Sequence, residues 1–301
     1  ETGARSYTGE SGICVAQPFE EALVLPMADP LYMIRLDLPL ETLVSLAKRR
    51  RVPLRDLDEG QAVHCALGEL FRDRAPKPFA IESQGAQPGS RRLYAYTRHS
   101  RDELLQSSNL FGDFDLHDAF DPDSLRERRL PDCFPERMAF RVRLCPIVRF
   151  RRVIDLEVEI DGNTKLIQLG TKKKQSSPYE VDAFVAACIR SHESGAGALP
   201  SQQRESVYLD WFRDLAGRAK GFEVEGVRLA GMRSVRLSRR DHAAGGRKSH
   251  LLDRREIIVS GLLKVSEQDA FRKQLCQGIG RHKAFGFGMI LLRPESEIAR
   301  C

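Results

Sequence analysis

The chain has 301 residues, a mass of 34.0 kDa and a formal net charge of +6, from 48 Lys and Arg against 42 Asp and Glu. Hydrophobic residues make up 42% and charged residues 30%, which allows two folded domains and excludes a disordered chain. No apolar run reaches the ~18 residues of a membrane span and no signal pattern opens the sequence, so we expect a cytoplasmic protein without membrane contact. The basic balance favours an anionic partner.

The seven cysteines are scattered along the chain, are odd in number and are never spaced C-x-x-C. The seven histidines are equally dispersed and form no H-x-E or H-E-x-x-H motif. This pattern argues against a zinc site and against a disulfide framework. We therefore expect a reducing compartment, no metal ion and no cofactor.

The first half of the chain alternates predicted strands and helices. Apolar residues at every second position predict strands, and apolar spacings of three and four predict helices. The strands lie over 31–38, 79–83, 91–97 and 138–150, and the helices over 40–51 and 58–71. This order matches a ferredoxin-like β-α-β-β-α-β unit, closed by the strand at 138–150. Residues 1–25 are expected to form a flexible tail, and the polar stretch 100–135 a surface elaboration.

The second half repeats this order. Helices are predicted over 176–191, 208–220 and 266–277, and strands over 222–240, 257–265 and 289–292. The basic sequence around the turn at Gly245-Gly246 predicts a long hairpin. We therefore expect an α+β protein with two tandem ferredoxin-like (RRM-like) domains, over 26–152 and 153–301, with a helical insertion around 175–204.

A glycine-rich loop, GIGRHKAFGFG at 278–288, lies between the last predicted helix and the last strand. A P-loop or Rossmann turn needs the strand before the glycines and the helix after them, so a nucleotide cofactor is disfavoured. The backbone N–H groups of such a loop can approach an anion, and its three cationic side chains add positive charge. The candidate contacts are Gly278, Gly280, Arg281, His282 and Lys283. A tight structural turn is the alternative.

Five segments together resemble the CRISPR repeat-RNA-processing endoribonucleases of the RAMP superfamily, particularly the CasE branch (subtype I-E) and its relatives in type IV systems. They are GIGRHKAFGFGMILLRP, IIVSGLLKVSEQDAFRKQLCQ, FRVRLCPIVRF, YLDWFRDLAGRAKGFEVEGV and EGQAVHCALGELF. The terminal glycine loop is the specific one. The resemblance implies two ferredoxin-like domains side by side and a basic cleft for the stem-loop of the repeat RNA. Insertions relative to the compact branch favour a type IV-like member.

The resemblance also implies metal-independent cleavage at the 3′ side of the stem, in which the ribose 2′-OH attacks the adjacent phosphate. The products are a 2′,3′-cyclic phosphate and a 5′-OH. The family's histidine corresponds to His64, but Gln61 stands where close relatives have a tyrosine. Because a glutamine cannot titrate, we expect cleavage to depend less on His64 and more on Arg35 and Arg239, both facing the interdomain cleft.

The remaining expected contacts are with RNA phosphates. They come from a long strand, a lysine run and the hairpin: Arg141, Arg143, Arg149, Lys172, Lys173, Lys174, Arg233, Arg236, Arg240, Arg247 and Lys248. The expected partners are CRISPR repeat RNA, the mature crRNA and other subunits of an effector complex, with no DNA-specific site.

Three questions stay open in the sequence. The segment 175–204 is expected to project as a helical finger toward RNA or a partner subunit, although its apolar face can equally pack on its own domain. A non-catalytic RNA-binding scaffold subunit of the same superfamily would carry every basic patch. A generic basic α+β enzyme would require the glycine loop to match by chance.

Overall fold

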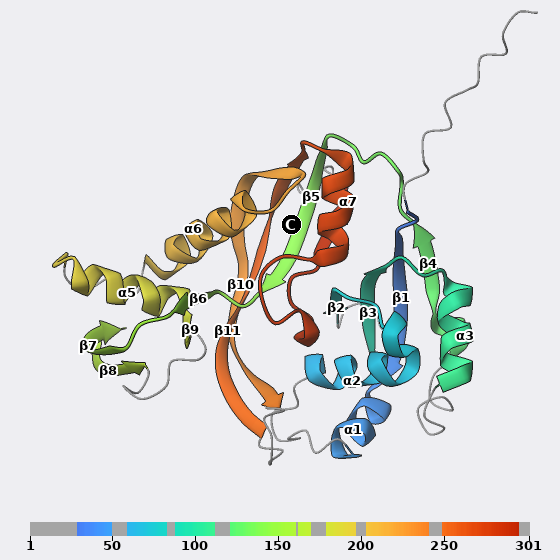
Figure 1. Ribbon diagram of the computed structural model, residues 1–301, viewed down its shortest axis with the longest axis horizontal. Coiled ribbons are helices and arrows are strands. Elements are labelled where there is room, and N and C mark those ends of the chain that lie inside the picture. Colours follow the sequence, from blue (N-terminus) through green and yellow to red (C-terminus); the bar gives the residue numbers. More distant parts are fainter. Residues whose placement is uncertain are drawn as a thin grey trace, which may run out of the picture.

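The computed structural model describes residues 29–49, 59–82, 88–111, 121–160, 162–169, 179–196, 203–240 and 249–294. Two four-stranded antiparallel sheets organise this part of the chain, accompanied by two small two-stranded sheets (Figure 1). Within these ranges no helix has the length and hydropathy needed to cross a lipid bilayer.

The first sheet has the strand order β2-β3-β1-β4. Its strands are β1 (Tyr32–Pro39), β2 (Phe79–Glu82), β3 (Ser90–Thr97) and β4 (Arg126–Arg129), and its helices are α1 (Leu40–Arg49), α2 (Glu59–Phe71) and α3 (Arg101–Phe111). Ile34, Leu36 and Leu38 alternate along β1 and are fully buried in one cluster with Val63 and Leu67 of α2. This order and these crossovers make a ferredoxin-like unit.

The fourth strand of this unit is not the strand predicted at 138–150. The chain forms β5 (Arg137–Leu144), which pairs with strands of the second sheet, and β6 (Ile147–Phe150), which pairs elsewhere. The actual fourth strand, β4, lies in the stretch interpreted as a surface elaboration. Its four residues, RERR, are all exposed, so no apolar alternation marks it as a strand. The chain therefore passes from the first sheet to the second between Arg129 and Arg137, and not at the predicted domain boundary at 152.

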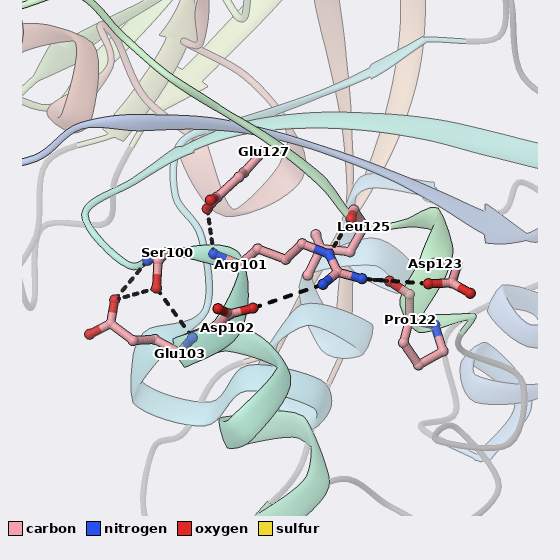
Figure 2. Close-up of polar contacts among 8 residues, drawn as sticks. All are labelled: Ser100, Arg101, Asp102, Glu103, Pro122, Asp123, Leu125 and Glu127. Carbon is pink, nitrogen blue, oxygen red and sulfur yellow. Dashed lines mark hydrogen bonds and ion pairs between the residues drawn. The ribbon is translucent and has the colours of Figure 1, made fainter.

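Polar contacts hold β4 in place where apolar burial cannot (Figure 2). At the start of α3, the Ser100 backbone N–H donates to the Glu103 carboxylate and the Glu103 N–H to the Ser100 hydroxyl, a capping box. The Arg101 backbone N–H donates to the Glu127 carboxylate, and its guanidinium donates to the carbonyls of Leu125 and Pro122. The helix start thus fixes the edge strand.

The second sheet has the same topology, with strand order β10-β11-β5-β12. Its further elements are α6 (Arg204–Gly217), β10 (Phe222–Arg240), β11 (Ser249–Val265), α7 (Gln268–Gln277) and β12 (Ile290–Arg293). The order β5-α6-β10-β11-α7-β12 is a second ferredoxin-like unit, and β10 and β11 form the long predicted hairpin. The fold class of two tandem ferredoxin-like units is confirmed.

An insertion follows β5 in the second unit. It contains β6, β7 (Ile154–Ile160), β8 (Asn163–Leu169), β9 (Tyr179–Asp182) and α5 (Ala183–Glu193). The Asp182 carboxylate caps α5 by accepting from the N–H groups of Phe184 and Val185. Phe184 and Cys188 are buried in the same cluster as Phe212 of α6. The apolar face of the expected finger therefore packs against its own unit, which is the alternative that the sequence left open.

The two units pack directly against each other. The buried Tyr96 hydroxyl of β3 donates to the carbonyl of Ile290 in β12, at 2.8 Å. The buried Arg272 guanidinium of α7 donates to the carbonyls of Asp29 and Pro131. This contact sets the two sheets at a fixed distance and leaves a cleft between them.

Candidate functional site

A cleft of about 1190 Å³ lies between the two units. The first unit contributes Gly60 from α2, residues 80–82 from β2 and Arg91 from β3, and the second contributes β5 and the β10–β11 hairpin. Cationic side chains outnumber acidic ones along its walls. The cations are Arg91, Arg141, Arg143, Lys165, Arg204, Arg233, Arg236, Arg254 and Arg255; the acids are Glu59, Glu82, Asp182, Asp253 and Glu256.

Ion pairs fix several of the predicted cations inside this cleft. Glu256, which is 2% exposed, accepts from Nε and Nη2 of Arg143 and from Nε of Arg233, at 2.6–2.9 Å. Arg236 pairs with Asp253 at 2.8 Å, and Arg141 lies 3.6 Å from Glu82 across the cleft. These arginines are oriented side chains of the cleft wall rather than freely moving surface cations.

The predicted cationic stripe along 138–150 is interrupted. Arg141 and Arg143 lie on β5, whereas Arg149 is exposed on β6, beyond the break at Cys145-Pro146. Further predicted contacts have side chains outside the described residues: Arg239 and Arg240 at the end of β10, and Lys172, Lys173, Lys174, Arg247 and Lys248 in segments outside the described ranges.

The glycine loop is folded back on itself. Gly278, Gly280, Gly286 and Gly288 all have positive φ, and a Cβ at Gly288 would lie 2.1 Å from the Ile279 carbonyl oxygen. The N–H of Gly278 donates to the carbonyl of Gln274, and the N–H of Gly288 to that of Arg143. The Gly278 amide, which was expected to approach an anion, is therefore already used inside the chain.

Two of the loop's three cationic side chains point to one carboxylate. Arg281 Nε donates to Glu180 Oε1 at 2.8 Å, and His282 Nε2 lies 3.3 Å from Glu180 Oε2. The adjacent imidazole of His282, followed by the charge of Arg281, lowers the pKa of Glu180 to about 2. The third loop cation, Lys283, donates to the Gln277 carbonyl at 2.6 Å. Arg281 and His282, predicted to contact RNA, join the loop to β9.

His64 lies where α2 meets this loop. A Cβ at Gly60 would lie 2.2 Å from the Phe285 carbonyl oxygen, so only a glycine allows the helix to approach this closely. His64 follows one turn later on the same helix face. Its Nδ1 is buried and has no hydrogen-bond partner among the described residues. Burial, and then the charge of Lys77, lower the pKa of His64.

The segment that carries Lys77 also contacts the loop. The next residue, Pro78, is buried, and its ring carbons lie 3.0 Å from the Cβ position of Gly278. The fold thus brings His64, Lys77 and the glycine loop to one place, although 214 residues separate His64 from Gly278 in the chain. His64 itself does not line the cleft; Gly60, one turn away, does.

Arg35 occupies a different position from the expected one. It lies on β1, directly opposite Tyr94 of β3 and Arg126 of β4, on the sheet face that points away from the helices. Its Nε is buried without a hydrogen-bond acceptor among the described residues. Arg35 is not one of the residues that line the cleft, because β3 and β2 lie between β1 and that edge of the sheet. The expectation that it faces the cleft is wrong.

Comparison with known proteins assigns the family. A model of the CRISPR associated protein family matches residues 31–294, most of the chain. The chain belongs to the CRISPR associated protein family. No curated protein sequence matches it.

Several solved structures are similar to this CRISPR associated protein. Cse3 of Thermus thermophilus bound to an RNA representing a pre-cleavage complex is 15% identical, with 88% of this chain and 100% of that chain covered and a TM-score of 0.45. Cas6e of Escherichia coli K-12 is 15% identical, with coverages of 88% and 99% and a TM-score of 0.40. A chain of a CRISPR RNA-guided surveillance complex is 17% identical, with coverages of 87% and 99% and a TM-score of 0.46.

Sequence reasoning did not identify three site residues of this CRISPR associated protein. Lys77 stands beside a proline in a short connection, where no periodic pattern singles it out. Glu180 follows the lysine run but lies 101 residues from its partner Arg281. Glu256 is one of few acids in the basic hairpin. From the sequence alone this indicates only a partial balance of charge and no particular partner.

Glu180→Gln should destabilise this CRISPR associated protein at pH 5–6 by roughly 2–4 kcal/mol, because the glutamine loses the ion pair with Arg281 and weakens the contact with His282. The folded-state pKa near 2 lies below the ordinary 4.5, so the stabilisation is present above pH 4.5 and is lost as the pH falls toward 2. Urea unfolding at pH 5.5, 4 and 3 measures this difference. The same change at the exposed Glu157 is the control. A cost that is independent of pH would contradict the ion-pair explanation.

Proposed function

We propose that this chain is a metal-independent endoribonuclease that binds the stem-loop of CRISPR repeat RNA. It cleaves the precursor RNA at the 3′ side of the stem, leaves a 2′,3′-cyclic phosphate and a 5′-OH, and retains the mature crRNA for an effector complex. The observation that carries this proposal is the imidazole of His64, with a lowered pKa and an unpartnered Nδ1, one turn from a cationic cleft in a CRISPR associated protein.

The proposed chemistry needs a base, an acid and a cation. His64 accepts the proton of the ribose 2′-OH, since its lowered pKa keeps the imidazole neutral near pH 7. The 2′-oxygen forms a bond to phosphorus, the bond from phosphorus to the 5′-oxygen breaks, and the leaving 5′-oxygen takes up a proton from solvent water, which acts as the acid. The Lys77 ammonium, close enough to affect the pKa of His64, stabilises the negative charge of the phosphorane.

RNA recognition in this proposal uses the cleft. The deep major groove of A-form RNA is too narrow for most side chains, so a stem is recognised through phosphates, 2′-OH groups and shape. Arg233 is 67% exposed at its side chain, and Arg149 is exposed, so both can reach a phosphate. Arg239, on the hairpin strand β10, is proposed as a further phosphate contact.

Incubating the purified protein with synthetic repeat RNA and excess chelator tests the function. The expected product carries a 2′,3′-cyclic phosphate, which resists phosphate-monoester phosphatase until acid opens the ring. RNA that is bound but remains intact would instead identify a non-catalytic scaffold subunit. Cleavage that stops on chelation would contradict the metal-independent mechanism.

RNA affinity should fall steeply with salt. Each neutralised phosphate of a duplex contributes a slope of about −0.9 to log K against log salt concentration. With several arginines along the cleft, we expect a slope of roughly −3 to −6 between 50 and 300 mM salt. Filter binding of the stem-loop at five salt concentrations measures it. A nearly flat response would contradict binding through the cationic cleft.

A further inference from the structure

The buried carboxylate of Glu256 lies between two arginines from neighbouring strands. In the second sheet, β11 runs between β10 and β5, and Glu256 on β11 stands directly opposite Arg233 of β10. Ile258, on the same strand face as Glu256, stands opposite Arg143 of β5. The register therefore puts all three side chains on the sheet face that lines the cleft.

The Glu256 carboxylate contacts the Nε–Nη2 edge of both guanidinium groups. It lies 2.7 and 2.6 Å from Nε and Nη2 of Arg143, and it accepts from Nε and Nη2 of Arg233 at 2.9 and 3.3 Å. No contact with Glu256 involves Nη1 of either arginine. Because a guanidinium carries five N–H donors on two edges, each arginine keeps its Nη1 edge for another acceptor.

Arg143 is restrained on a further side. Its guanidinium carbon lies 4.3 Å from the ring centroid of Phe287, a residue of the glycine loop region. A Cβ at Gly286 would lie 3.4 Å from Arg143 Nη1, so the missing side chain leaves room at this end of the guanidinium. Packing thus fixes the arginine at the cleft wall, with its Nη1 beside Gly286 of the glycine loop.

This arrangement of two arginines around one carboxylate is better explained by anion binding than by a contribution to the stability of the fold. A buried ion pair seldom stabilises a fold more than apolar residues of the same volume would. Two arginines paired with one carboxylate keep a net charge of +1. Because their side chains are already ordered, binding a phosphate costs less conformational entropy. The planar guanidinium edge matches two phosphate oxygens.

We propose that Arg143 and Arg233 form a seat for one phosphodiester group of the RNA backbone, and that Glu256 is the positioning residue that orients both guanidinium groups toward it. This inference rests on the proposed function, because RNA is the ligand that supplies the phosphodiester. The inference goes beyond that function because it assigns the acidic residue Glu256 a role in RNA binding, so that removing its negative charge weakens the binding of RNA.

Glu256→Gln separates positioning from simple charge. The substitution keeps the side-chain volume and removes one negative charge, so long-range electrostatics alone would strengthen RNA binding. Loss of orientation weakens binding instead, and we expect the Kd for the stem-loop to rise roughly 5- to 20-fold. The slope of log K against log salt should also become shallower by about 1, which a merely structural role would not produce.

Arg233→Lys provides a second test, in which the substituted side chain is exposed and not buried as Glu256 is. Arg233 is 67% exposed, so the variant should fold, and lysine keeps the charge but lacks the planar edge. We expect a comparable loss of affinity. The matched control is Arg228→Lys, at an exposed position on the same strand outside the cleft, which should bind RNA as the wild type does.

Two outcomes are decisive. If Glu256→Gln and Arg233→Lys both bind the stem-loop as tightly as the wild type, with an unchanged salt slope, the phosphate seat is overturned while the proposed function stands. If the wild type itself fails to bind the stem-loop, the proposed function fails together with the inference. Should Glu256→Gln not fold, the comparison of the two lysine variants decides alone.

Discussion

His64→Ala should slow single-turnover cleavage of repeat RNA by roughly 10²–10⁴-fold while leaving the Kd for the RNA nearly unchanged. The imidazole lies at the junction of α2 and the glycine loop, and its buried Nδ1 has no protein partner among the described residues. In the proposed mechanism this imidazole takes part in the chemical step and not in binding the RNA phosphates. Protein concentrations that saturate the RNA separate the chemical step from binding.

The pH profile provides an independent check on the same residue. Burial and then the charge of Lys77 lower the pKa of His64 below its ordinary 6.5, and a general base acts in its deprotonated form. The wild-type rate should therefore rise with pH, through a midpoint below 6.5, and then level off. Lys77→Met removes the cation, so the pKa of His64 and this midpoint should move upward.

The control for His64 is His192→Ala. His192 is exposed in the last turn of α5, far along the chain from the loop junction, and its loss should change neither the rate nor the pH profile. Normal cleavage by His64→Ala would contradict the assignment. It would leave Arg239 as the remaining catalytic candidate that the sequence suggested.

Gly60→Ala should both destabilise the protein and suppress cleavage. Alanine normally stabilises a helix interior relative to glycine by about 1 kcal/mol, but the new Cβ would lie 2.2 Å from the backbone oxygen of Phe285. Neither backbone segment can retreat without separating α2 from the glycine loop. We expect a net cost of roughly 1–3 kcal/mol, and a slower reaction because His64 moves with the helix.

The matched control for this substitution lies in the same helix. Gly68→Ala adds a Cβ with no heavy atom within 4 Å, so it should raise the free energy of unfolding by about 0.5–1 kcal/mol and leave cleavage unchanged. Urea unfolding and single-turnover kinetics on both variants measure the contrast. Equal behaviour of the two alanine variants would show that the α2–loop contact has no bearing on stability or activity.

The amino-acid sequence by itself determined the elements whose signal is local. Periodicity over 58–71 and 266–277 predicts α2 and α7, and alternation along 31–38 predicts β1; the observed elements differ from these bounds by one or two residues. The turn at Gly245-Gly246 predicts the hairpin of β10 and β11. These features depend on residues a few positions apart, and the spacing of side chains along a helix or strand is the same in any fold.

Only the tertiary structure decided which sheet each strand joins and which charges meet. β5 follows the first unit in the chain but pairs with β11 and β12, because strand pairing is a long-range choice that alternation does not encode. β4 has no apolar pattern at all. Likewise, Glu180 meets Arg281 and Glu256 meets Arg143 across 101 and 113 residues of chain. A charge in a sequence carries no indication of its partner or its burial, and those two properties decide whether an arginine binds a carboxylate, a phosphate or both.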